Sequence, residues 1–191
     1  MAKVTVAPDL VMQVYEALDD DTNLVAFKFA LPSSVGTVTG ARLYLACFSK
    51  DGPANADYAS KTSADATWTS GSSGAAIAGV AMTSAIETIN ASLVPIGDWI
   101  SWDVYTTGAN SIAEAYAGTP GNFTVVLDSD YTSSTSNSRT QTTIVFFAED
   151  DVDYQVDFHG PSSASTSLRP YLEIEYTPAA GGDTEQFFKF F

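Results

Sequence analysis

The chain has 191 residues, of which 45% are hydrophobic and 16% are charged, and its formal net charge is −15. This length fits one domain with a substantial core, because a chain of ~150 residues already buries about two thirds of its unfolded surface. The excess of acidic side chains repels nucleic acids and anionic lipids, which excludes both as partners. Neither a signal peptide nor a run of ~20 apolar residues is present, so we expect a chain made in the cytoplasm and not in a membrane.

Apolar residues that alternate with polar ones recur along the chain, and this pattern predicts about eight half-buried β-strands. The predicted strands lie near residues 11–15, 25–31, 41–48, 100–106, 123–130, 142–150, 154–160 and 171–177. The side chains expected to face inward are those of Val25, Phe27, Phe29, Leu31, Leu43, Leu45, Cys47, Ile100, Trp102, Val104, Phe123, Val125, Leu127, Ile144, Phe146, Tyr154, Val156, Phe158, Leu172, Ile174 and Tyr176. Such strands favour an all-β fold, an antiparallel two-sheet β-sandwich of jelly-roll type.

Two segments have helical spacing instead. Residues 83–93 place apolar side chains three and four positions apart, and residues 108–118 do the same. In the second segment, Asn110 or Ser111 is the expected N-cap and Gly118 the expected stop. We therefore expect one or two short helices that cross the ends of the sandwich.

Residues 51–79 are rich in Ser, Gly, Ala and Asp and contain few apolar side chains. This composition is typical of a surface loop, anchored here by Tyr58 and Trp68. Residues 130–141 have a similar composition and predict a shorter, hairpin-like loop.

The C-terminal residues differ from the rest of the chain. "TPAAGGD" has linker composition, so we expect a sandwich domain over residues 1–178 and a flexible tail over residues 179–191. The tail ends in "FFKFF", and burying four phenylalanine rings is worth on the order of 10 kcal/mol. The favoured interpretation is docking on a neighbouring subunit, and the alternative is that the tail folds back on its own domain. The predicted partner-binding residues are Phe187, Phe188, Lys189, Phe190 and Phe191.

Five segments follow one another along the chain: "LVAFKFALPSSVGTVTGARLYLACFS", "TSADATWTSG", "ISWDVYTTGANSIAEAYAG", "TTIVFFAED" and "LRPYLEIEYTP". Their order resembles the DNRLRE family, a β-sandwich domain grouped with carbohydrate-binding modules. They span about residues 10–178. The chain departs from the family at Ala148, Glu149 and Asp150, where the family has Ser-Arg-Glu. The resemblance implies the sandwich fold and a carbohydrate-binding role at a cell surface or outside the cell.

Acidic side chains cluster at residues 19–21 and 149–153. Closely spaced carboxylates are ligands for calcium, which makes Asp150, Asp151 and Asp153 candidates for a structural calcium site. The alternative is that both clusters are simply solvated. His159 is the only histidine, which excludes a zinc site with two imidazoles.

Exposed aromatic rings are candidates for sugar binding, because they offer broad apolar faces to pyranose rings. Trp68 is the strongest candidate because it lies in the long loop, and Tyr58 and Trp99 are the others. Trp102 is expected in the core. The alternative for each of these rings is core packing.

The sequence contains no identifiable catalytic set, so we expect a protein that is not an enzyme. The first hypothesis is a structural subunit of a virus or phage particle, such as a capsid decoration, tail or fibre component, located in the virion. It would contact further copies of itself or other structural subunits through the aromatic tail. The alternative is a carbohydrate-binding module or adhesin that recognises a surface polysaccharide.

Overall fold

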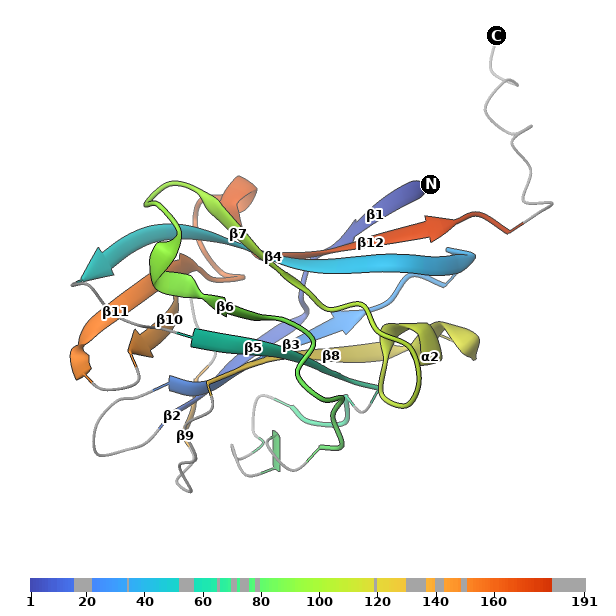
Figure 1. The fold of residues 1–191 in the computed structure, drawn as a ribbon, viewed down its shortest axis with the longest axis horizontal. Coiled ribbons are helices and arrows are strands. Elements are labelled where there is room, and N and C mark those ends of the chain that lie inside the picture. The colour runs from blue at the N-terminus through green and yellow to red at the C-terminus, as the bar shows by residue number, and fades with distance from the viewer. Residues whose placement is uncertain are drawn as a thin grey trace, which may run out of the picture.

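The computed structural model describes residues 1–15, 22–33, 35–51, 57–64, 66–69, 72, 76–77, 80–118, 120–129, 137–139, 143–148 and 151–179. These residues form two antiparallel β-sheets packed face to face (Figure 1), which confirms the predicted all-β sandwich. Twelve strands occur among the described residues, more than the eight expected.

The first sheet, called sheet I, is organised around one long strand. It contains, in order, β1 (Ala2–Val6), β12 (Tyr171–Thr177), β4 (Thr37–Asp51), β11 (Asp151–His159) and β10 (Thr143–Ala148), and β7 (Trp99–Asp103) pairs with β4. The 15 residues of β4 pair with β12, β7 and β11. This strand therefore holds the sheet together.

The second sheet, called sheet II, contains the remaining strands. Their order is β6 (Thr88–Asn90), β5 (Asp57–Ser63), β8 (Asn122–Asp128), β3 (Thr22–Ala30), β2 (Leu10–Tyr15) and β9 (Asn137–Arg139). Short helices connect strands at the ends of the sandwich: η1 (Ala91–Leu93), α2 (Ile112–Ala117) and η2 (Thr166–Leu168). None of the helices in the described ranges is long and apolar enough to cross a membrane.

The main core lies between the two sheets, and the predicted inward positions fill it. Of those positions, Tyr154 lies among residues whose side chains the structure does not describe, and all the others are buried or pack against the core. Aromatic rings form its centre: the Tyr58 ring stacks on Phe146 with centroids 4.1 Å apart, and Trp102 meets Phe146 edge-on at 5.8 Å. The indole Nε1 of Trp102 donates to the Tyr58 carbonyl at 3.0 Å, which satisfies its buried polar group.

A second, smaller core covers the opposite face of sheet II. The indole of Trp68 and the side chain of Ile77 pack there against Met12, Ala26 and Val126. Both faces of β8 are consequently buried, and all five of its central residues are inaccessible. The segment that carries Trp68 thus forms a third layer below sheet II, visible beneath β8 in Figure 1.

Strand β5 corrects the prediction of a surface loop over residues 51–79. It is hydrogen-bonded between β8 and β6, although its sequence DYASKTS lacks apolar alternation. Its buried hydroxyl groups bond to carbonyl oxygens of adjacent segments: Ser60 to Asp103 at 2.6 Å and Ser63 to Ala81 at 2.6 Å. A polar strand can be buried here because neighbouring backbone groups satisfy its side chains.

The two helical predictions had different outcomes. Helix α2 confirms the second, with Ser111 as the N-cap, whose Oγ accepts from the Glu114 amide at 3.1 Å, and Gly118 as the C-cap. The first is wrong, because residues 88–90 form strand β6 and only the single turn η1 is helical. Leu93 is 78% exposed, so the apolar spacing of residues 83–93 does not mark a buried helix face.

Candidate functional site

The outer face of sheet I, which points away from sheet II, gathers side chains from four adjacent strands. The strand register places Thr5 of β1 opposite Glu173 of β12. Glu173 in turn lies opposite Arg42 of β4, which pairs with Asp103 of β7. These four residues, the polar row, therefore cross the sheet at right angles to its strands, and residues opposite one another in register have neighbouring side chains.

An aromatic cluster lies beside the polar row. Tyr171 pairs with Tyr44, and their rings stack with centroids 4.8 Å apart. The ring of Trp99 meets Tyr171 edge-on at 5.3 Å. Trp99 is 37% exposed, and burial raises the pKa of the Tyr171 hydroxyl above its usual value. The three rings form a partly exposed apolar surface beside charged side chains.

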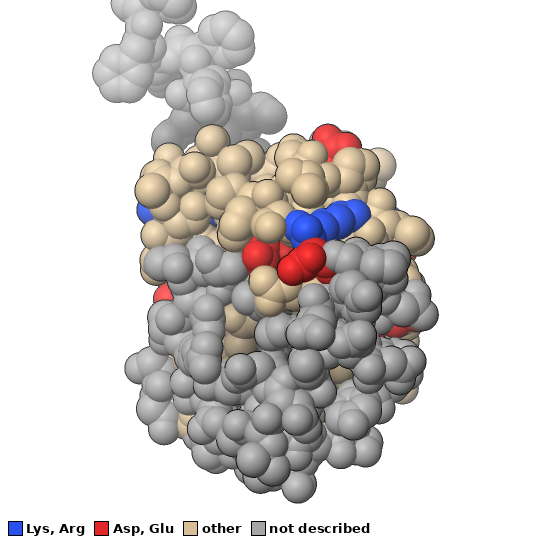
Figure 2. All heavy atoms as spheres, turned by 90° about the vertical axis from the view of Figure 1, so that its left-hand side faces the viewer, with Lys and Arg blue, Asp and Glu red and all other residues tan. Residues whose placement is uncertain are grey.

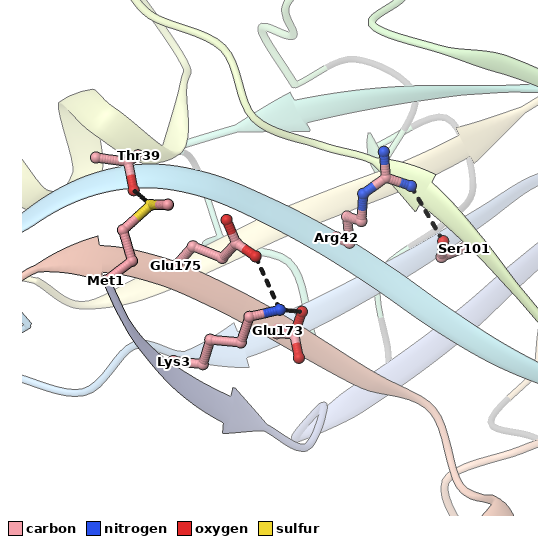
Figure 3. A network of polar contacts seen from close by, with 7 residues as sticks. All are labelled: Met1, Lys3, Thr39, Arg42, Ser101, Glu173 and Glu175. Carbon is pink, nitrogen blue, oxygen red and sulfur yellow. Dashed lines mark hydrogen bonds and ion pairs between the residues drawn. The ribbon is translucent and has the colours of Figure 1, made fainter.

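Lys3 organises the carboxylates at the edge of this face (Figure 3). Its Nζ donates to Oε1 of Glu173 at 2.9 Å and to Oε1 of Glu175 at 2.8 Å. The hydrogen bond from Lys3 lowers the pKa of the Glu175 carboxyl, and the same carboxylates raise that of Lys3. Arg42 Nη1 donates to Ser101 Oγ at 3.2 Å. Lys3 and Glu175 therefore stabilise each other's charged form.

Two open grooves run along the outer face and meet at Glu173. The first has a volume of about 520 Å³, within the range of about 300–1,000 Å³ typical of ligand sites. Its lining residues are Thr5, Ala7, Thr166, Ser167, Arg169, Pro170, Tyr171 and Glu173. The second groove, of about 230 Å³, is lined by Thr39, Gly40, Ala41, Arg42, Asp103, Tyr105, Glu173 and Glu175. Gly40 contributes no side chain to the second groove, and the side chain of Glu175 lies close over it.

Arg169 is held in place at one end of the first groove. Its Nε donates to the carbonyl of Ser163 at 2.8 Å. Ser163 is itself buried, and its hydroxyl bonds to Nδ1 of His159 at 3.0 Å. The guanidinium is therefore oriented by the loop between β11 and β12 rather than free to rotate.

The predicted sugar-binding residues separate into two groups. Trp68 is 3% exposed and Tyr58 is fully buried, which agrees with the core-packing alternative for both rings. Trp68 donates from Nε1 to Thr124 Oγ1 at 2.9 Å, and Lys28 covers its ring at 5.6 Å. In these positions neither ring offers a face to a sugar. Trp99 is partly exposed, and it belongs to the aromatic cluster.

The other predicted site residues lie largely outside the described residues. Asp150 and the tail residues Phe187, Phe188, Lys189, Phe190 and Phe191 are not described, and for Asp151 and Asp153 only the backbone is, within β11. Among the side chains that the structure describes, no group of three potential metal ligands occurs. The calcium and tail-docking hypotheses stay predictions.

Sequence reasoning missed Tyr44 and Tyr171. Both stand at the outward positions of alternating strands, between the inward residues of "ARLYLACF" and before Leu172 of "YLEIEYT". Their outward positions on alternating strands were the signal in the sequence that could have marked both tyrosines as surface residues. The pairing of β4 with β12, which brings these rings together, could not be read from the chain order.

Acidic side chains do not form one large patch on the described part of the surface that Figure 2 shows. Figure 2 shows the end of the sandwich that lies on the left in Figure 1, where most of the described surface is neither acidic nor basic. A basic side chain there lies directly against acidic ones. The sequence matches no protein-family model and no curated protein.

Proposed function

We propose that this protein is a non-enzymatic carbohydrate-binding domain that recognises a polysaccharide through the outer face of sheet I. The observation that carries the proposal is the aromatic cluster of Tyr44, Tyr171 and Trp99 beside the two grooves. Aromatic faces pack against the apolar faces of sugar rings, and polar groups beside them fix the hydroxyls. The resemblance to the DNRLRE family points to the same role and to a location at a cell surface or outside the cell.

The pairing of groove carboxylates with Lys3 favours binding over catalysis. A glycoside hydrolase needs one carboxylic acid whose pKa is raised so that it can protonate the leaving group. Lys3 instead lowers the pKa of Glu175 and bonds directly to Glu173. Glu175 is therefore suited to accept hydrogen bonds from sugar hydroxyls rather than to donate a proton.

A binding assay with matched aromatic variants tests the proposal. The purified chain is screened against a glycan array, and hits are measured by isothermal titration calorimetry. Tyr171→Ala and Trp99→Ala should each weaken binding about tenfold or more, which corresponds to about 1.4 kcal/mol. Leu93→Ala is the control, because Leu93 is exposed on η1 and lines neither groove. An array without hits, or equal losses in all three variants, would refute the proposal.

A second candidate function is that of a structural subunit in a virus or phage particle. It rests on the four phenylalanines of the terminal "FFKFF", whose burial against a neighbouring subunit would contribute strongly to assembly. The partners would be further copies of this chain or other structural subunits, and the location would be the virion. Multi-angle light scattering tests this: the full chain should form multimers, and replacement of the four phenylalanines by serine should give monomers. A monomeric full chain at high concentration contradicts it.

A further inference from the structure

We infer that the ligand is an internal stretch of a neutral polysaccharide chain, which crosses the strands of sheet I and occupies both grooves at once. This inference rests on the proposed carbohydrate-binding function and adds the class of glycan and the way it lies. Three observations carry it: the continuity of the grooves, the balance of charge along them, and the unequal chemistry of their linings.

The two grooves adjoin at one shared lining residue, and we take them together as one track across the sheet. Glu173 lines both, so they meet on β12, with the first extending toward β1 and η2 and the second toward β4 and β7. Both are open grooves rather than enclosed cavities. A site that holds only a terminal sugar needs a wall that stops the chain, whereas an open track over four strands accepts a polymer that continues beyond it.

The second groove extends the track past β12, and Gly40 and Glu175 line it together. Gly40 lies opposite Glu175 in the strand register, and a β-carbon added at Gly40 would come within 3.1 Å of Glu175 Oε2. A larger side chain at Gly40 would therefore displace the Glu175 carboxylate and change the shape of the second groove. The first groove does not include Gly40, so the two halves of the track can be altered separately.

The charges along the track cancel. Three cationic side chains, those of Lys3, Arg42 and Arg169, stand beside three carboxylates, those of Glu173, Glu175 and Asp103. The chain as a whole carries −15, so its long-range field repels polyanions. A track without net charge in a strongly acidic protein selects for a neutral glycan and against an acidic one.

The linings suit a hydroxyl-rich ligand. The first groove combines the ring of Tyr171 with the side chains of Thr5, Thr166 and Ser167 and the oriented guanidinium of Arg169. Hydroxyl groups both donate and accept, as sugar hydroxyls do. The second groove is lined mainly by polar and charged groups, so it adds hydrogen bonds rather than stacking. We therefore expect the first groove to hold the sugar that binds most tightly.

The test measures affinity against chain length. Neutral oligosaccharides of the cello, manno, xylo and laminari series, from disaccharide to hexasaccharide, are titrated into the full chain by calorimetry. In the series that binds, affinity should rise at least tenfold from the disaccharide to the hexasaccharide. Gly40→Leu should abolish most of that rise, whereas Tyr171→Ala should weaken every length. If Gly40→Leu does not fold, Arg42→Ala removes a wall of the same groove and serves in its place.

Each result has one meaning. Binding without dependence on length, or an equal effect of Gly40→Leu on short and long ligands, overturns the extended track but leaves a carbohydrate-binding function. Tighter binding of polygalacturonate than of the neutral series at low salt overturns the neutral ligand. No binding to any glycan overturns the proposed function itself.

Discussion

Truncation of Trp68 should destabilise the protein without affecting any ligand, because its ring holds the third layer on sheet II. A tryptophan buries ~150–250 Å², worth about 4–6 kcal/mol at ~25 cal/mol per Å². The ring is 3% exposed, bonds to Thr124 and is covered by Lys28. Since measured losses for buried Trp→Ala changes are about 3–5 kcal/mol, we expect Trp68→Ala to lower the free energy of unfolding by that amount. The melting temperature should fall by about 6–20 °C.

Urea denaturation followed by circular dichroism measures this loss, and Trp99→Ala is the matched control. Trp99 is 37% exposed and lies on the binding face, so its truncation should cost about 1 kcal/mol or less. The two variants should therefore show opposite behaviour: Trp68→Ala loses stability and keeps glycan affinity, and Trp99→Ala does the reverse. Equal stability losses, or glycan binding lost in Trp68→Ala while its stability is unchanged, would refute the assignment of Trp68 to the core.

Three further predictions concern charge and backbone. Lys3 lowers the pKa of Glu175 below its usual 4.5. This ion pair therefore stabilises the fold above pH 4.5, and its contribution is lost as the pH falls through the lowered pKa. Lys3→Met should return the Glu175 pKa toward 4.5 in a carbon-13 NMR titration, and an unchanged pKa would contradict the pairing. Burial raises the pKa of Asp157 above 3.8, so its ionised form disfavours folding near neutral pH. Asp157→Asn should therefore raise the denaturation midpoint at neutral pH but not below pH 3.8. A higher midpoint that persists in acid would point to another cause. Gly36 and Gly97 both have positive φ, but of these two only Gly36 would bring an added β-carbon against backbone, 2.3 Å from the carbonyl oxygen at the end of β12. Gly97→Ala should therefore lower the free energy of unfolding by about 1 kcal/mol, and Gly36→Ala should lower it clearly more. Equal losses in chemical denaturation would contradict the close approach at Gly36.

The sandwich could be predicted because its inward residues alternate with polar ones. Phe27, Leu43 and Phe158 stand in such runs, and each is fully buried. Strand β5 could not be predicted this way, since hydroxyl groups such as that of Ser60 are buried by bonding to distant carbonyls rather than by their apolar character. The burial of Trp68 has the same origin: sheet II is covered on its second face, which a local pattern does not reveal.

The candidate site was predictable only in part. Trp99 was recognised, but its partners Tyr44 and Tyr171 lie more than fifty residues away on either side of it in the sequence, and only the strand pairing brings all three together. The grooves depend on the same pairing, because Gly40 and Glu175 line the second groove together only where β4 and β12 are paired. Single residues can be chosen from a sequence by type, whereas a surface that spans four strands requires the topology.

The pairing of β1 with β12 has a mechanical consequence. Ala2 lies opposite Tyr176, so the two ends of the sandwich leave from the same end of one antiparallel ladder. A force that pulls these ends apart would break the hydrogen bonds between β1 and β12 one pair after another, rather than all pairs at once. Among the contacts described, no side-chain hydrogen bond or ion pair joins the first pair, Ala2 and Tyr176. The ion pairs of Lys3 begin at the second pair, Lys3 and Glu175. Under tension β1 would therefore separate from β12 first, and this separation would open the edge of the groove that Thr5 lines.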